Sequence, residues 1–282
     1  MANLNFRSRL VLSVSPANPA LVTESLFDTN YKEATDSPID EYLTRLLAIN
    51  KLAPLPNAFD PFQGQLVLLG VIAAVESYFR TLFRRLIAFD PGCQESVEKR
   101  DVSYSAAIHL SREMLPEAML ERISFVSAHN ITTAIRELIG VAGGVPAELE
   151  SAIKDYVRVC QLRHCAVHRF GKLGVSNAIS LGLMEHKSLL EKPLKLDYVA
   201  LQNTIAISTC LVRTLNNFLF NELLSRVPAS SWSGSYVKDK GAFTSYYKLF
   251  ADKVSSNGSA QANQIYKQFI RQRTMFAAGG KY

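Results

Sequence analysis

One apolar stripe between Leu68 and Leu86 constrains the fold of this chain more than any other feature. Its members recur at steps of three or four residues, which is the spacing of one face of an α-helix. They are Leu68, Ile72, Val75, Phe79, Leu82 and Leu86. A β-strand would need alternation with a period of two. The stripe therefore predicts a long core helix that begins near Gly64 and ends before Pro91.

Other segments carry the same helical spacing, whereas no repeat of fixed period and no alternation of strands with helices is present. The further predicted helices are a short one at 39–50, others at 103–114 and 117–139 with a break at Asn130, one starting at Pro146, and a long one at 196–224. This pattern predicts an all-α fold, a helical bundle. The segment Val175–Met184 alternates weakly and is expected to form a small hairpin or loop insertion.

The distribution of proline and charge divides the chain into three parts. Six of the eleven prolines lie in residues 1–63, which are expected to form an irregular N-terminal wrap. Residues 64–227 contain the predicted helical bundle. Residues 228–282 form a basic, aromatic-containing C-terminal extension, because residues 238–282 hold eight Lys and Arg against two Asp and therefore carry the whole net charge of +6.

Such a basic segment suggests a polyanionic partner, since Lys and Arg that neutralise phosphates release counterions. The candidate nucleic-acid-binding residues are Lys238, Lys240, Lys248, Lys267, Arg271 and Arg273. Tyrosines and phenylalanines interleave with them, which suits stacking on bases. Two short helices that pack their apolar faces on the bundle would produce the same pattern, so both interpretations remain open.

Composition predicts a soluble chain. Of the 282 residues, 48% are hydrophobic and 20% are charged, as in ordinary globular proteins, and the longest apolar run, Leu66–Val75, stops at Glu76 after ten residues. The apolar stretch near the N-terminus is too short for a secretory signal. The four cysteines form no CxxC pair and are expected to stay reduced. A cytoplasmic location with no membrane contact follows as an expectation.

The densest polar cluster lies at the end of the helix predicted from Pro146, at residues 163–169 (RHCAVHR). The chain has no dinucleotide-binding glycine motif, P-loop, serine-hydrolase elbow, HExxH pair or kinase signature. Most common enzyme classes therefore lack support, and this cluster remains the candidate site.

The cluster carries a resemblance to a known family. Arg163 is followed directly by the polar residue His164 and, five positions on, by His168. This arrangement resembles the R-x4-6-H motif of HEPN domains, in which Asn, Asp or His is typical after the arginine. The first long helix is similar too, because its apolar run is followed by Glu76 and then by aromatic and basic residues. The resemblance covers about residues 64–226.

The resemblance implies a metal-independent endoribonuclease of the toxin or antiviral-defence type, without a cofactor. It implies a homodimer that brings two motifs to one cleft, with RNA as substrate and an antitoxin or sensor protein as a further partner. Cleavage requires proton transfer at the 2′-OH and the 5′-oxygen, and stabilisation of phosphate charge. His168 suits the proton transfers and Arg163 the phosphate, while His164 would orient the substrate and Glu76 would support the site.

Four other interpretations stay open at this point. The Arg163–His168 cluster could be a helix C-terminus where cations interact with the last carbonyls. Glu76 could pair along its own helix with Arg80 and Arg84. Cys160, His164 and His168 share a helical stripe and could bind a metal, although no second paired cluster completes a zinc site and none is expected. A HEPN-like bundle could also be a non-catalytic module that binds nucleotide, RNA or a protein.

Overall fold

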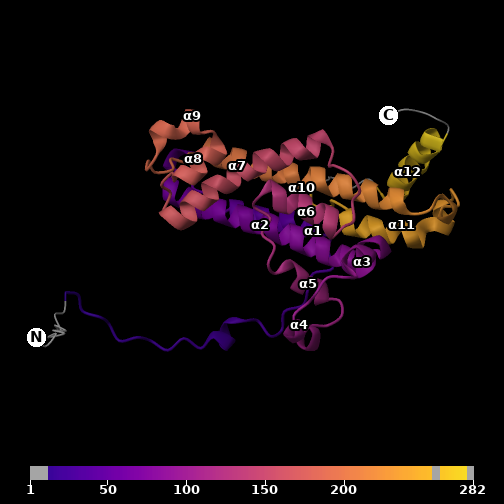
Figure 1. Cartoon of the computed structure of the whole chain (residues 1–282), viewed down its shortest axis with the longest axis horizontal. Coiled ribbons are helices and arrows are strands. Elements are labelled where there is room, and N and C mark those ends of the chain that lie inside the picture. Colours follow the sequence, from indigo (N-terminus) through magenta and orange to yellow (C-terminus); the bar gives the residue numbers. More distant parts are fainter. Residues whose placement is uncertain (1–11, 256–260, 278–282) are drawn as a thin grey trace, which may run out of the picture. The chain divides into compact units, whose positions relative to one another are not determined.

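Two 29-residue helices, α2 (Pro61–Phe89) and α10 (Tyr198–Arg226), form the centre of the helical part of the chain (Figure 1). Helix α1 (Pro38–Asn50) packs along α2, and α7 (Ala147–Arg169) packs along α10 and also contacts α2. The computed structural model describes residues 12–255 and 261–277. These residues contain no β-strand, so the predicted all-α class is confirmed.

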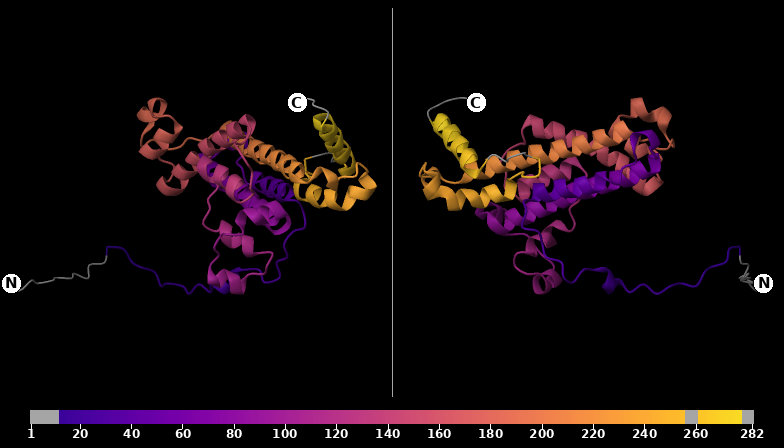
Figure 2. Two further views of the ribbon diagram at one scale, coloured as in Figure 1. Left: turned by 45° about the vertical axis from the view of Figure 1, so that its right-hand side comes forward. Right: turned by 180° about the vertical axis from the view of Figure 1, so that it is seen from behind.

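The described residues contain twelve further elements. They are η1 (Thr23–Leu26), η2 (Pro56–Ala58), α3 (Pro91–Val97), α4 (Tyr104–His109), α5 (Leu115–Leu120), α6 (Ala128–Glu137), α8 (Val175–Leu181), α9 (Leu183–His186), η3 (Lys187–Leu189), η4 (Ala229–Ser231), α11 (Tyr236–Phe250) and α12 (Ala262–Ala277). Figure 2 shows the same elements from two further sides.

The chain divides structurally between Thr35 and Asp36. Residues 12–35 are exposed throughout and contain only the turn η1. Helix α1 was expected within the N-terminal wrap, but it belongs to the helical unit because its apolar face is buried against α2. Ser37 caps α1 by accepting a hydrogen bond from the Asp40 backbone N–H at 3.2 Å.

The predicted long helices are confirmed by α2, α7 and α10. Side-chain caps fix where two of them begin, because Asp60 accepts the Phe62 N–H at 2.9 Å and Asp197 accepts the Ala200 N–H at 2.7 Å. The apolar stripe of α2 is buried along its length, and Phe79 stacks on Phe125 with ring centroids 4.8 Å apart. Among the described residues, α2 is the one helix that is long and apolar enough to cross a membrane. The core helix of a soluble protein meets the same criteria, and 56% of the most apolar window of α2 is buried.

Two local predictions were wrong. The helix expected at 117–139 breaks at 121–127 rather than at Asn130, because Ser127 accepts the Asn130 N–H at 3.2 Å and starts α6. The stretch Val175–Met184 forms α8 and the start of α9, not a hairpin. The weak alternation of apolar residues did not produce a strand. Asn177 of α8 is buried instead and donates to the Gln161 side chain of α7 at 3.0 Å. The second set of helical spacing, 103–114, yields only the short α4.

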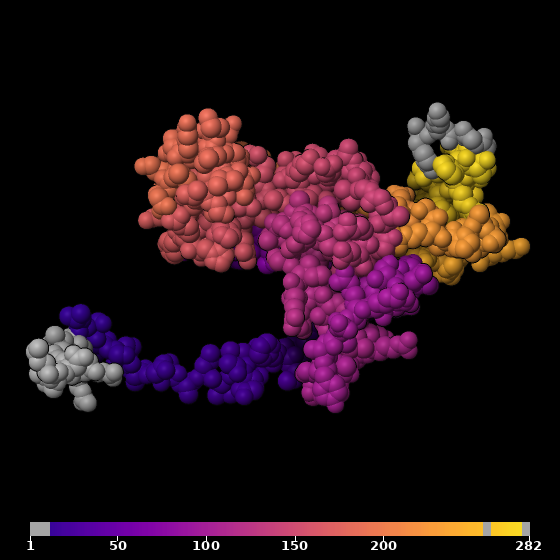
Figure 3. Space-filling model, viewed as in Figure 1, coloured from indigo at the N-terminus to yellow at the C-terminus, as the bar shows by residue number. Residues whose placement is uncertain are grey.

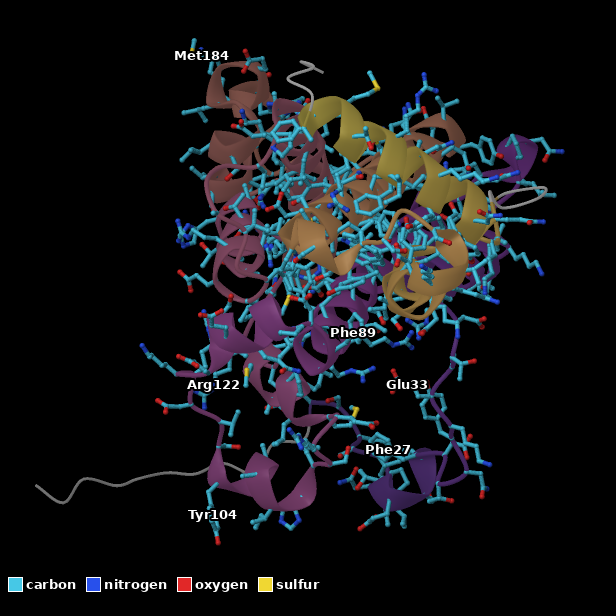
Figure 4. All side chains as sticks on the ribbon, turned by 90° about the vertical axis from the view of Figure 1, so that its right-hand side faces the viewer. Phe27, Glu33, Phe89, Tyr104, Arg122 and Met184 are labelled. Carbon is cyan, nitrogen blue, oxygen red and sulfur yellow. The ribbon has the colours of Figure 1, made fainter. Side chains whose placement is uncertain are left out.

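The basic C-terminal segment contributes to the core. Phe243 of α11 and Tyr266 of α12 are buried, and the Tyr246 hydroxyl donates to the Asp90 carboxylate at 2.9 Å. Phe89, labelled in Figure 4, packs edge-on against Tyr246 with ring centroids 4.9 Å apart. Asn216 of α10 donates to the Phe250 carbonyl at 2.8 Å. The aromatic residues of this segment therefore hold α11 and α12 on the bundle.

Candidate active site at the end of helix α7

The motif occupies the last two turns of α7. The helix ends at Phe170, which has a left-handed backbone with φ of 51°, and Gly171 follows with φ of 89°. The Gly171 N–H donates to the Cys165 carbonyl at 3.0 Å, which closes the helix end. The predicted glycine-containing turn after the motif is therefore present, and it leaves the His168 side chain exposed.

The two motif histidines lie side by side on the surface. Their rings are one helical turn apart, with centroids separated by 4.5 Å and planes tilted by 50°. The pKa of His164 is lowered, first by partial burial and then by the neighbouring His168 and by the positive charge of Arg163. His164 is therefore largely neutral at pH 7 and is suited to accept a proton.

Arg163 points elsewhere on α7. It follows Tyr156 and Cys160 on the stripe of the helix that faces the core, and it is half-buried. No hydrogen bond or ion pair joins the Arg163 side chain to another residue in the described part of the chain. Arg163 and His168 are five residues apart, which separates them by about 140° around the helix. One chain thus brings His164 and His168 together, but it does not bring Arg163 to His168.

Glu76 lies on α2 near this stripe, but it does not pair with Arg80 or Arg84. Its Oε1 atom accepts hydrogen bonds from the Ser124 hydroxyl and the Phe125 backbone N–H, both at 3.1 Å. Glu117 takes the arginines instead. Arg80 lies 3.3 Å from one of its oxygens and Arg84 lies 3.9 Å from the other. The proposed intrahelical line is therefore wrong, because a tertiary partner competes for both guanidinium groups.

The metal interpretation of Cys160, His164 and His168 gains no support. In the ranges that the structure describes, no three His, Cys, Asp or Glu side chains converge as a set of metal ligands. Burial, with a smaller contribution from the nearby Glu76 charge, raises the pKa of the Cys160 thiol to about 12. A metal binds the thiolate, so this environment opposes ligation by Cys160.

Sequence patterns missed an exposed apolar surface beside Arg163. Phe62 and Leu66 of α2 are about half exposed, as is Val167 of α7, and Phe170 is 79% exposed. The rings of Phe62 and Phe170 stack with centroids 5.4 Å apart. A sequence signal for this surface was present. Phe62 and Leu66 are four residues apart, as are Arg163 and Val167, and this spacing continues the buried stripes of both helices beyond the core.

The six candidate cations of the C-terminal segment lie on α11 and α12. Five are exposed, and Arg273 donates to the Ala229 carbonyl. That carbonyl lies just beyond the end of α10, whereas the turn after α7 lies by its start, where the Leu194 N–H donates to the Gly171 carbonyl at 2.8 Å. Figure 3 shows the two regions at opposite ends of the helical unit. A 29-residue helix is about 40 Å long, so the motif and α12 do not form one site.

No protein-family model, curated protein or solved structure matches this chain.

Proposed function

We propose that this chain is a metal-independent endoribonuclease of the HEPN type that acts as a toxin or antiviral-defence effector in the cytoplasm. The observation that carries the proposal is the exposed pair of imidazoles of His164 and His168 at the end of a core helix that also bears Arg163. Imidazoles exchange protons near neutral pH, and a guanidinium binds phosphate oxygens through a planar set of donors.

In the proposed reaction the ribose 2′-oxygen attacks the adjacent phosphorus while the bond from phosphorus to the 5′-oxygen breaks. One imidazole removes the proton of the 2′-OH, and another imidazolium donates a proton to the departing 5′-oxygen. His164, whose pKa is lowered, is suited to remove the 2′-OH proton or to orient the substrate. His168 is the main group for proton transfer. Arg163 stabilises the charge that develops on the phosphate oxygens.

A second protomer would complete this arrangement. Arg163 and His168 of one chain diverge by about 140°, so a symmetric partner must present its own motif for both groups to reach one phosphate. Exposed apolar residues at the start of α2 and the end of α7, namely Phe62, Leu66, Val167 and Phe170, would be covered by such a partner. Light scattering is expected to give twice 31.3 kDa, and Leu66→Glu is expected to give the monomer and to reduce cleavage.

The same divergence favours one alternative, a non-catalytic HEPN-like module. If the protein is a monomer without cleavage activity, the surface would instead hold nucleotide, RNA or a regulatory protein. The exposed apolar residues beside Arg163 would then contact an antitoxin or sensor protein. Cleavage by the purified protein distinguishes the two functions.

The decisive experiment compares Arg163→Ala and His168→Ala with two matched controls on total RNA. The controls are Arg122→Ala and His109→Ala, which change exposed residues of the same types away from the motif. We expect both motif variants to lose cleavage by at least about 100-fold with unchanged circular dichroism, the controls to cleave normally, and EDTA to have no effect. Cleavage at the wild-type rate by His168→Ala would overturn the assignment.

We further propose that the exposed cations of α11 and α12 bind RNA at the other end of the bundle. An RNA that reaches both α12 and the motif must span about 40 Å. Affinity for a long RNA is then expected to fall steeply with salt, and Lys238→Gln, Lys240→Gln and Lys248→Gln together should reduce that slope by somewhat under one per lost contact. An unchanged slope would show that these lysines are not phosphate contacts.

A further inference from the structure

A pocket of about 260 Å³ lies between α7, α9 and α10, on the turns of α7 that precede the motif. Its floor is apolar and includes Leu162 and Ile207. Five side chains with polar or charged groups line it from three helices: Asp155, Arg158, His186, Asn203 and Thr204. The pocket shares no residue with the Arg163–His168 segment, and Arg158 is about 8 Å from Arg163 along the helix axis.

The turn between α8 and α9 fixes the histidine of this pocket. Gly182 adopts φ of 111°, a backbone conformation that favours glycine. The His186 Nδ1 atom lies 2.8 Å from the Gly182 carbonyl and donates to it. This hydrogen bond orients the ring and leaves Nε2 as the nitrogen that can contact a ligand.

Of the other four polar side chains, three are exposed and have no partner in the described residues. Asp155, Arg158 and Asn203 make no hydrogen bond or ion pair with another residue within 12–255 and 261–277. Thr204 beside them differs, because its hydroxyl donates to the Leu201 carbonyl at 2.7 Å. A carboxylate, a guanidinium and an amide, all three exposed to solvent, therefore line one small pocket together with an imidazole nitrogen, and a ligand can replace the water on them.

We propose that this pocket binds one nucleotide whose base carries an exocyclic amino group. The base would lie on Leu162 and Ile207. The Asn203 amide can donate to and accept from the base edge, and the Asp155 carboxylate accepts from an amino group. Arg158 and His186 would contact the phosphate. The choice of a nucleotide rests on the proposed ribonuclease function, for which the pocket would hold a nucleotide next to the cleaved bond.

The test uses the full-length protein and measures binding by isothermal titration calorimetry with 5′-AMP, 5′-UMP, adenosine and inorganic phosphate. We expect 5′-AMP to bind more tightly than each of the other three probes by about tenfold, the effect of one lost hydrogen bond with its desolvation. Arg158→Gln and Asn203→Ala should each weaken 5′-AMP binding by about tenfold. Arg122→Gln, a matched exposed arginine, should not change it.

Several outcomes would overturn the proposal. They are the absence of saturable 5′-AMP binding, equal affinity for phosphate alone, equal affinity for 5′-UMP, or unchanged binding in both pocket variants. Circular dichroism checks that the variants fold, which their exposed positions favour. His168→Ala should keep 5′-AMP binding. If the protein binds 5′-AMP but cleaves no RNA, the pocket proposal stands and only the ribonuclease proposal is rejected. If it cleaves RNA but does not bind 5′-AMP, only the pocket proposal is rejected.

Discussion

The two ends of α10 differ in what their side chains are committed to. At the end that carries α11 and α12, three aromatic residues are buried against one another. They are Phe243, Tyr266 and Trp232, whose ring centroids lie 5.2 to 6.4 Å apart. At the end that carries the motif, His164, His168 and Phe170 are exposed. Aromatic residues among cations thus stabilise the fold at one end, while the other end leaves polar and apolar groups free for a partner or substrate.

The largest expected effect concerns deletion of the chain from Ser235. The deletion removes Phe243, Tyr246, Phe250 and Tyr266, which are buried. Each fully buried aromatic side chain contributes about 1.5–3 kcal/mol, so the free energy of unfolding should fall by more than about 5 kcal/mol, a large share of the stability of a domain. Thermal unfolding followed by circular dichroism measures this loss.

The matched control for the deletion is the triple variant Lys238→Gln, Lys240→Gln and Lys248→Gln. It removes charge and leaves the packing in place, so each substitution should change stability by less than about 0.5 kcal/mol. A deleted protein that still unfolds cooperatively at the wild-type temperature would show that α11 and α12 are not part of the core.

Two phenylalanines give a direct comparison of the two ends. Phe243→Ala should destabilise by about 3–5 kcal/mol, because its ring is fully buried. Phe170→Ala should cost less than about 1 kcal/mol, because its ring is 79% exposed. Urea unfolding of the two variants measures both values, and similar losses would contradict the contrast between the ends.

Glu76→Ala should have an intermediate effect. It leaves the Phe125 N–H without its acceptor in a buried part of the chain, which costs about 1–3 kcal/mol. The exposed Glu121, changed in Glu121→Ala, is the control and should be near neutral. Once stability is known, the cleavage rate of folded Glu76→Ala protein measures its support of the motif separately. If the Glu76→Ala protein is as stable as the wild type, Glu76 has no structural role.

The smallest effect is electrostatic. Burial is the first cause of the lowered pKa of His164, and the charge of His168 is the next. In His168→Gln the pKa of His164 should therefore rise but stay below its ordinary value, since burial remains. Because a lowered histidine pKa means that the folded protein resists protonation, the imidazole signal should titrate only as the pH falls below that ordinary value. NMR titration of both proteins measures this, and an unchanged or lower pKa would contradict the coupling.

The sequence by itself determined the helices and the place of the motif. The spacing of apolar residues predicts α2, α7 and α10. These properties depend on residues a few positions apart, so a local pattern is sufficient to predict them. The same reasoning placed Arg163, His164 and His168 at the end of a helix before a glycine turn.

Only the tertiary structure decided which partner each group takes. Glu117, not Glu76, pairs with Arg80 and Arg84, because folding brings α5 against α2. Phe243 and Phe250 of α11 pack on Phe220 of α10, and Tyr266 of α12 packs on Phe243. His186 came to line a pocket with Arg158 and Asn203. Each choice is a competition between residues far apart in the chain, and the winner depends on which surfaces the fold brings into contact.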